Sequence, residues 1–297
     1  MLYKKSHKSS EAAPAPADKS LRFPPSYGFV GLGIMVLGEI ALFSGVGLVA
    51  RWFTPIMWTG YILFTDSLIR RRKGTSLLSR YPLEFFLLAV ISIGSWVIFE
   101  AYNVLLKNWR YVGLPENMLV RYFGYAWSFA TISPGMFLTY ELLESYLPGT
   151  NPARSPRLGD GLFYGFVVCG LGAVIVPLIW PSTYMTPLVW LGLTLLIDPI
   201  NQRLGERSFV SEFFAGRFRA PLTMFLAGLI CGLLWEFWNY WADTKWQYDV
   251  PYLGDVKLFE MPVLGFLGFM PFGVESYAIY VFVRRLIPIP RQVRYLG

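Results

Sequence analysis

The chain carries the same pattern of residues twice. Four residues recur 132 positions later (186 minus 54 for the first of them): Thr54, Pro55, Trp58 and Asp66 return as Thr186, Pro187, Trp190 and Asp198. Two further motifs recur at offsets of 136 and 137 (236 minus 100 and 246 minus 109): Glu100, Asn103, Trp109 and Tyr111 return as Glu236, Asn239, Trp246 and Tyr248. Two copies that differ by short insertions show such a slow increase in offset. The pattern therefore predicts two halves of the same architecture.

The apolar runs of the sequence determine its class. Hydrophobic residues make up 55% of the 297 positions and charged residues 15%, whereas a soluble domain carries about 25% charged residues. Four runs are almost free of charge and long enough to cross, or nearly cross, a bilayer: 28–50, 82–98, 161–180 and 221–234. We therefore predict an all-α polytopic membrane protein.

Extending this pattern to weaker runs predicts about eight transmembrane helices, arranged as two parallel four-helix repeats. The predicted spans are 28–50, 54–70, 81–102, 121–141, 161–181, 186–201, 220–241 and 261–284. An even number of spans per half leaves both copies in the same orientation, related by an axis along the membrane normal. The predicted organisation is a disordered tail (1–25), a first repeat (26–146), a linker (147–160), a second repeat (161–286) and a C-terminal tail (287–297).

Basic residues are distributed unequally between the two sides of these spans. One side carries six of the 26 Lys and Arg residues, and the other carries the remaining 20 (26 minus 6). The six are Arg51, Lys107, Arg110, Arg121, Lys245 and Lys257. Because basic loops stay in the cytoplasm, we expect both termini there, in a plasma (bacterial inner) membrane. Residues 1–22 lack the apolar core of a cleavable signal, so we expect the first span to remain in the mature protein.

The sequence lacks the side chains that several classes of functional site require. The only histidine is His7, so the sequence predicts no histidine-ligated metal, no His-based catalysis within the membrane and no cofactor. Cys169 and Cys231 lie in apolar runs and are expected to pack as small hydrophobic residues. The basic residues that give the net charge of +7 lie beside the spans. This position favours anionic membrane lipids over nucleic acid as partners.

The repeated Glu-x-x-Asn motif supplies the candidate catalytic residues. The spacing places Glu100 and Asn103, and likewise Glu236 and Asn239, on one face of a helix. Two carboxylates near a central axis could act as acid and base or bind a cation. The alternative is that they are ordinary hydrated carboxylates at the membrane interface, because Glu100 lies near the end of its span.

Aromatic residues surround these carboxylates and are the candidate substrate-lining residues. They are Trp96, Trp109, Tyr111, Trp235, Trp238, Trp246 and Tyr248. They could line the mouth of a lipid or polyene site, or they could anchor surface loops at the interface. Glu39 and Glu275 are the acids nearest the middle of the membrane and are further candidates, either functional or hydrogen-bonded to a neighbouring helix.

The remaining repeated residues have mainly structural interpretations. Asp66 and Asp198 end the second and sixth spans, where an ion pair such as Asp66 with Arg70 competes with a phosphate-binding role for the basic loop. Pro134 and Pro271 lie inside spans and could kink them. The pairs Gly161/Gly165 and Gly228/Gly232 favour close helix packing.

The order of these motifs resembles that of the membrane-embedded lycopene cyclase domains of carotenoid synthesis. In the first half the matching residues are Trp96, Glu100, Trp109 and Gly113-Leu-Pro115-Glu116. In the second half they are Trp235, Glu236, Trp246 and Glu260-Met-Pro262. The family's acid pair after the proline is absent here, since Asn117 and Met118 follow Glu116, and Val263 and Leu264 follow Pro262. The resemblance implies acid-initiated carbocation chemistry on a long isoprenoid, with aromatic faces stabilising positive charge.

Three hypotheses of function follow from these patterns. The first is a membrane protein that binds or processes a hydrophobic lipid or carotenoid-type isoprenoid ligand with its paired carboxylates. The second is a structural or assembly subunit that contacts other membrane proteins. The third is a transporter or channel that depends on Glu39 or Glu275. The sequence leaves open whether the protein is an enzyme.

Overall fold

The computed structural model describes residues 23–149, 155–251 and 254–289, which form a helical protein with four short strands. The elements before the linker are α1 (Ser26–Phe43), α2 (Gly47–Arg51), α3 (Phe53–Lys73), α4 (Leu77–Arg80), α5 (Pro82–Leu106), β1 (Trp109–Val112) and α6 (Met118–Glu144). Those after it are α7 (Asp160–Ile179), η1 (Thr183–Met185), α8 (Thr186–Arg203), α9 (Phe209–Phe214), α10 (Arg219–Trp241), β2 (Lys245–Tyr248), β3 (Lys257–Leu258), β4 (Met261–Pro262), η2 (Val263–Gly265) and α11 (Phe266–Leu286).

Six helices of the described residues are long and apolar enough to cross a membrane. They are α1, α5, α7, α8 with η1, α10, and α11 with η2. This confirms the prediction of a helical, membrane-integral protein. Helices α3 and α6 coincide with the predicted spans 54–70 and 121–141 but fall outside this set: Asp66 and the basic run from Arg70 lower the hydropathy of α3, and Ser, Thr, Tyr and Trp lower that of α6. The predicted tails lie largely, and residues 150–154 of the linker entirely, outside the described residues.

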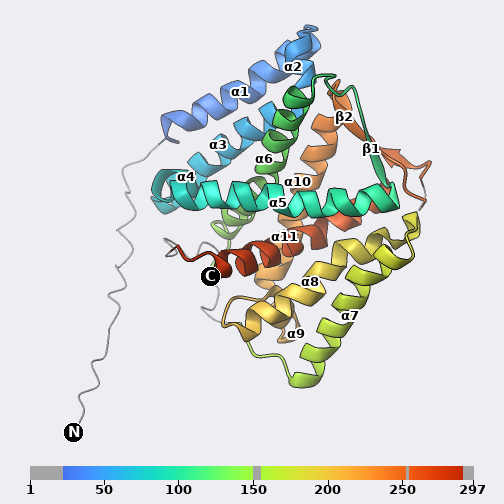
Figure 1. Cartoon of the computed structure of the whole chain (residues 1–297). Helices are drawn as coiled ribbons and strands as arrows, with labels where there is room; N and C mark the ends of the chain where they lie inside the picture. The colour runs from blue at the N-terminus through green and yellow to red at the C-terminus, as the bar shows by residue number, and fades with distance from the viewer. Residues whose placement is uncertain (1–22, 150–154, 252–253, 290–297) are drawn as a thin grey trace.

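The helices pack in matching pairs in the two parts of the chain. Helix α1 lies against α3, and α7 lies against α8; α3 and α5 both contact α6, while α8 and α10 both contact α11 (Figure 1). Only 17% of the apolar window of α1, and the same share of α7, is buried, whereas the share is 56% in α10 and 67% in α11. Helices α1 and α7 are therefore peripheral, and α10 and α11 form the interior.

Glycines set the closest helix contacts. A Cβ atom on Gly31 of α1 would lie 2.5 Å from the carbonyl oxygen of Gly60 in α3, and one on Gly170 of α7 would lie 2.5 Å from the backbone nitrogen of Leu196 in α8. Gly228 and Gly232 of α10 meet Phe269 of α11 in the same way, as predicted. The predicted packing role of Gly161 and Gly165 is wrong within this chain, because a Cβ on either would meet nothing within 4 Å.

A serine from α5 enters the backbone of α6 where the two helices cross. The Ser92 hydroxyl donates to the carbonyl oxygen of Phe129 at 2.5 Å and accepts from the backbone N–H of Ser133 at 3.0 Å. It therefore bridges the turn that precedes Pro134, which lies inside α6 as Pro271 lies inside α11. In the second half the counterpart of Ser92, at an offset of 136 (228 minus 92), is Gly228. Gly228 makes the close approach of α10 to α11.

Asp66 and Asp198 hold the short helices α4 and α9. Asp66 accepts hydrogen bonds from the Ser76 hydroxyl at 2.7 Å and the Leu78 backbone N–H at 3.0 Å, and Asp198 accepts from Ser208 and from the backbone of α9. Both carboxylates are fully buried and are occupied by these bonds. The expected pairing of Asp66 with Arg70 is therefore replaced by helix capping, for which an Asp side chain is well suited.

A buried ion pair joins α5 to α11. The Arg284 guanidinium contacts both carboxylate oxygens of Glu84, at 2.7 and 3.1 Å, and the Tyr280 hydroxyl donates to the same carboxylate at 2.5 Å. Both charged side chains are 2% exposed. Fork-to-fork geometry with a third hydrogen bond is the arrangement in which a buried ion pair is best compensated for its lost hydration.

Candidate functional site

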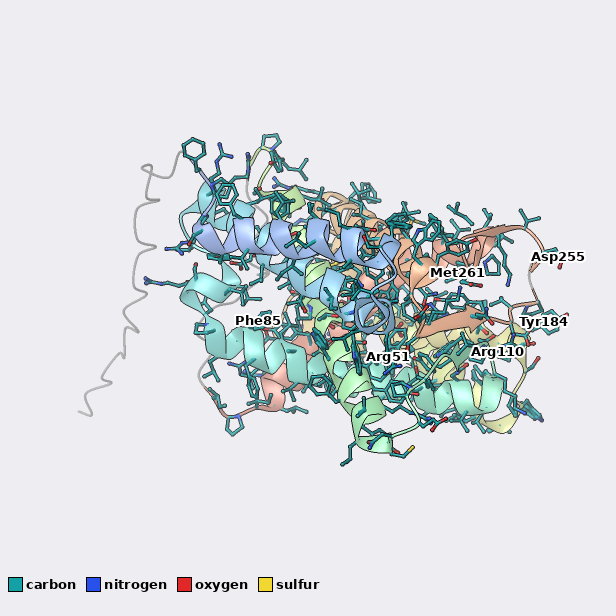
Figure 2. All side chains as sticks on the ribbon, turned by 90° about the horizontal axis from the view of Figure 1, so that it is seen from above. Arg51, Phe85, Arg110, Tyr184, Asp255 and Met261 are labelled. Atoms are coloured by element: carbon teal, nitrogen blue, oxygen red, sulfur yellow. The ribbon has the colours of Figure 1, made fainter. Side chains whose placement is uncertain are left out.

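A two-stranded ribbon brings the two repeated Trp-x-Tyr motifs together. Strands β1 and β2 pair antiparallel, with Trp109 opposite Tyr248 and Tyr111 opposite Trp246 (Figure 1). Because side chains alternate along a strand, these four residues share one face of the ribbon. The other face carries Arg110, which donates to Gln247 across the strands at 3.2 Å. Figure 2 shows Arg110 at the same end of the molecule as Tyr184 and Asp255, with Phe85 far from it.

Glu100 in α5 receives three hydrogen bonds on one carboxylate oxygen. Oε1 accepts from Tyr111 Oη at 2.5 Å, from Trp96 Nε1 at 2.8 Å and from Trp109 Nε1 at 3.2 Å. Two of the donors come from β1 and one from the preceding turn of α5. Hydrogen bonds of this kind compensate a carboxylate for part of its lost hydration without any nearby cation.

Glu236 in α10 has the corresponding partners but one oxygen to spare. Its Oε1 accepts from Tyr248 Oη at 2.9 Å and from Trp246 Nε1 at 3.3 Å, and that indole N–H also lies 2.9 Å from Tyr248 Oη. Position 232, which corresponds to Trp96, is a glycine. Glu236 is fully buried, and its Oε2 has no hydrogen-bond partner among the described residues.

Asn103 and Asn239 attach the strands to the helix ends. Asn103 donates to the Trp109 carbonyl oxygen at 2.8 Å and accepts from the Trp109 N–H at 3.1 Å; Asn239 makes the same two bonds to Trp246, at 2.8 and 2.9 Å. Their carboxamides are thus committed to backbone groups. The geometry gives these two catalytic candidates a positioning role: they fix where the Trp and Tyr side chains point.

The two ribbon tyrosines remain hydrogen-bond donors over a wide pH range. Burial raises the pKa of Tyr111 and of Tyr248 well above the ordinary value, and the negative charge of the neighbouring glutamate raises each further. Both effects disfavour a phenolate. Each phenol therefore stays protonated and keeps its hydrogen bond to Glu100 or Glu236.

A cavity of about 430 Å³ lies beneath the ribbon. Its lining includes all five donors to the two glutamates: Trp96, Trp109, Tyr111, Trp246 and Tyr248. The rest of the wall comes mainly from the start of α8 and from η2 and α11, with Trp190, Gly265, Gly268 and Phe269. The volume falls in the range of about 300–1,000 Å³ that is typical of small-molecule sites, which are mostly apolar with a few polar groups.

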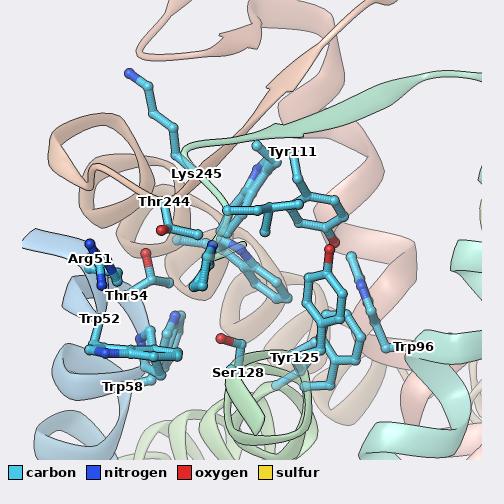
Figure 3. A pocket seen from close by; sticks show the side chains of 18 residues that line it. Arg51, Trp52, Thr54, Trp58, Trp96, Tyr111, Tyr125, Ser128, Thr244 and Lys245 are labelled. Carbon is cyan, nitrogen blue, oxygen red and sulfur yellow. The ribbon is translucent and has the colours of Figure 1, made fainter. Parts of the chain in front are cut away.

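A second, much smaller pocket of about 60 Å³ occupies the corresponding place near α3. Figure 3 shows its aromatic lining, with Arg51, Thr54 and Thr244 on one side and Trp96, Tyr111 and Tyr125 on the other. Thr54 here corresponds to Thr186 in the larger cavity. A space of this size holds a few water molecules and no larger ligand.

The structure brings six of the predicted lining residues to the cavity wall and leaves three elsewhere. Trp235 joins the five donors at the wall. Trp238 is not there: it is 4% exposed and packs edge-on against Trp58, with ring centroids 5.1 Å apart. Glu39 lies on the peripheral helix α1, half-buried, and Glu275 is buried against α8, where it accepts from the Leu193 N–H at 3.2 Å.

Several residues of the cavity were missed by the sequence analysis. Asn108 and Thr186 supply polar groups, and Trp190 supplies a ring. Thr186 and Trp190 belong to the repeated Thr-Pro-x-x-Trp pattern, which was interpreted only as evidence of duplication. The same repetition could have marked them as candidate lining residues. Asn108 has no such signal, since its counterpart at an offset of 137 (245 minus 108) is Lys245.

The described part of the chain contains no group of three or more His, Cys, Asp or Glu residues placed to hold a metal ion. No protein family model, curated protein sequence or solved structure matches this chain.

Proposed function

We propose that this protein binds a hydrophobic ligand of the lipid or isoprenoid class, of which a carotenoid-type compound is one member, in the 430 Å³ cavity. The observation that carries the proposal is that all five hydrogen-bond donors to Glu100 and Glu236 line that cavity. Aromatic rings held in fixed orientation by a buried carboxylate, Glu236, and a half-buried one, Glu100, make a preorganised apolar site, which lowers the entropic cost of binding.

The rim of the cavity supports entry from the membrane. Leu191, Leu264 and Leu267 border the cavity, and their side chains are 41%, 44% and 57% exposed on the apolar surface of α8, η2 and α11. An opening lined by exposed leucines suits a ligand that partitions into lipid before it binds. The ligand then passes from acyl chains to aromatic rings without crossing water.

The two carboxylates have different roles in this proposal. Glu100, whose Oε1 accepts three hydrogen bonds, orients Trp96, Trp109 and Tyr111. Glu236 has a free oxygen, so it can hold or release a proton next to Tyr248, whose hydroxyl borders the cavity. If the ligand is chemically converted, a protonated Glu236 supplies the proton through Tyr248: the phenol receives the Glu236 proton as it gives its own to the ligand, and so never becomes a phenolate.

The same proposal includes a duplicated architecture of eight spans, arranged as two parallel four-helix repeats with both termini in the cytoplasm. The matched bonds of Asn103 and Asn239 to their strands, and of Asp66 and Asp198 to the short helices, support the duplication. The pairing of β1 with β2 supports the parallel arrangement, because both ribbon strands must then lie on the same side of the membrane.

The test is mass spectrometry of the hydrophobic compounds that remain with the gently solubilised wild-type protein. We expect a polyprenyl or polyene compound in close to equal molar amount with the chain. We also expect Glu236→Gln to change the chemical identity of that compound if a proton is transferred, and to leave its amount unchanged. A chain that carries only the bulk lipids of the membrane would contradict the proposal and would favour a structural role in a larger complex.

A further inference from the structure

Four aromatic side chains border both the large cavity and the small pocket: Trp96, Tyr111, Trp235 and Trp246. Because side chains that line two neighbouring spaces lie between them, these four residues form a wall, which we call the aromatic partition. The exposed leucines of the rim border the large cavity alone. A ligand that enters the cavity at the rim therefore meets the aromatic partition at the inner end of its path, with the small pocket behind it.

Trp235 is the member of the aromatic partition that spans it from one space to the other. Its ring centroid lies 6.0 Å from that of Trp58, which borders the small pocket and not the cavity, and 6.4 Å from that of Phe269, which borders the cavity and not the small pocket. The other three members donate hydrogen bonds to Glu100 or Glu236, whereas Trp235 donates to neither carboxylate in the described part of the chain. Trp235 therefore separates the two spaces by packing alone.

The volume of the cavity limits the length of an apolar ligand. An apolar protein cavity of about 150 Å³ holds one benzene ring, which corresponds to roughly 25 Å³ for each carbon atom. By this measure the cavity of about 430 Å³ holds roughly 17 carbon atoms. Isoprenoids grow in five-carbon units, so the cavity has room for three to four of them. A forty-carbon carotenoid would leave more than half of its chain outside the rim.

We propose that Trp235 limits the length of the ligand, so that the cavity takes up three to four isoprene units and no more. This inference rests on the proposed function and narrows its ligand class to isoprenoids of about fifteen to twenty carbon atoms. Each unit that enters gains contacts with the aromatic wall. A further unit finds no room behind the aromatic partition and stays among acyl chains, which are as apolar as the cavity. Affinity should therefore grow with chain length only until the cavity is full.

The experiment is displacement of tritium-labelled geranylgeraniol from the purified full chain in detergent. The competitors are the alcohols with two, three, four and five isoprene units, from geraniol to geranylfarnesol, compared at equal mole fraction in the micelle. For the wild type we expect affinity to rise by about tenfold from geraniol to farnesol, the effect of five packed atoms in a drug-sized ligand. The rise from farnesol to geranylgeraniol should be smaller. Geranylfarnesol should bind within about twofold of geranylgeraniol, because its last unit makes no new contacts.

Two substitutions should move this limit in opposite directions. Trp235→Leu leaves room for roughly one more isoprene unit and opens the cavity toward the small pocket, so geranylfarnesol should bind about tenfold more tightly than geranylgeraniol. Gly268→Val should shorten the space, because Gly268 borders the cavity and a Cβ there meets nothing within 4 Å. The gain from farnesol to geranylgeraniol should then disappear. Gly33→Val, on the peripheral helix α1, is the matched control and should keep the wild-type series.

The outcomes separate this inference from the proposed function. If labelled geranylgeraniol does not bind the wild type, both fail. If it binds and the affinity of the wild type keeps rising up to geranylfarnesol, the length limit is overturned while the hydrophobic site stands. The same holds if either folded variant, Trp235→Leu or Gly268→Val, keeps the wild-type series. Farnesol is expected to bind every variant, so its binding reports that each is folded; if Trp235→Leu does not fold, Gly268→Val alone decides.

Discussion

Glu236 and Glu100 occupy matching positions but differ in how completely they are hydrogen-bonded. Glu236 is fully buried among aromatic residues, yet it receives only the Tyr248 and Trp246 donors, and its Oε2 has no partner among the described residues. Natural proteins tolerate such a group mainly where it has a use. This difference makes Glu236, rather than Glu100, the residue at which protonation is expected to matter.

Replacing Glu236 therefore has an effect that depends on what replaces it. Glu236→Gln keeps an acceptor for Tyr248 and Trp246, so we expect the thermal midpoint in detergent to change little. Glu236→Leu leaves the Tyr248 hydroxyl without an acceptor, at about 1–3 kcal/mol, and leaves the Trp246 indole with Tyr248 Oη as its acceptor, so it should lower the midpoint clearly. Thermal unfolding followed by circular dichroism measures both. Equal midpoints for the two variants would show that the hydrogen bonds to Glu236 do not stabilise the fold.

At the scale of elements, the ribbon depends on the asparagines that attach it. Asn239→Leu removes both side-chain bonds to Trp246 and should loosen β2 without unfolding α10. We expect amide hydrogen exchange of residues 245–248 to accelerate by about tenfold or more, because each of the two lost hydrogen bonds contributes about 0.5–1.5 kcal/mol. The amides of α1, which packs mainly against α3, are the internal reference. Unchanged exchange in β2 would mean that strand pairing alone holds the ribbon.

The packing of α1 against α3 offers a matched pair of substitutions. A side chain at Gly31 would collide with the backbone of α3, whereas a Cβ at Gly33, two residues away, meets nothing within 4 Å. We expect Gly31→Leu to destabilise the protein by about 1–3 kcal/mol, as overpacking does, and Gly33→Leu to be nearly neutral. Unfolding in detergent compares them, and equal stability would contradict the close α1–α3 contact.

The elements also show what the sequence can and cannot predict. Long apolar runs located the helices well, because hydrophobicity over about 20 residues is a strong signal. The ribbon was expected only as surface loops that carry aromatic residues, since four-residue strands such as Trp109–Val112 are too short for alternation to stand out. Paired residues of the two strands lie 133 to 139 positions apart (245 minus 112 and 248 minus 109), and no local pattern specifies such a pairing.

The candidate site was predictable to a similar degree. The duplication selected Glu100, Glu236 and the Trp and Tyr residues of the two ribbon strands, since both copies retain them; Trp96 has no counterpart, because position 232 is a glycine. It could not assign Trp238, which packs on Trp58 in the core instead of lining the cavity. Nor could it find Asn108, because that residue gains its place only when β1 meets the start of α8. Tertiary contacts of this kind are not encoded by spacing along one helix.

At the scale of the whole molecule, the Glu84–Arg284 ion pair links α5 to α11, which come from opposite ends of the chain. Arg284→Met leaves a buried carboxylate without its cation and should destabilise the protein by about 3–5 kcal/mol. The double variant Glu84→Leu with Arg284→Met removes both charges and should recover most of that loss. Denaturant titrations of the single and double variants measure it. A double variant no more stable than Arg284→Met would contradict the account of a buried, mutually compensated pair.

The cavity itself gives the most direct test of the central claim, that a hydrophobic ligand occupies the space beneath the ribbon. Gly268 borders the cavity, and a Cβ there meets nothing within 4 Å, so Gly268→Phe should fill the space without disturbing the fold. Gly33→Phe, on the peripheral helix α1, is the control. The measurement is the molar ratio of tightly bound hydrophobic compound to chain, by mass spectrometry. We predict a ratio near one for the wild type and Gly33→Phe and near zero for Gly268→Phe; the same ratio in all three proteins would contradict the account.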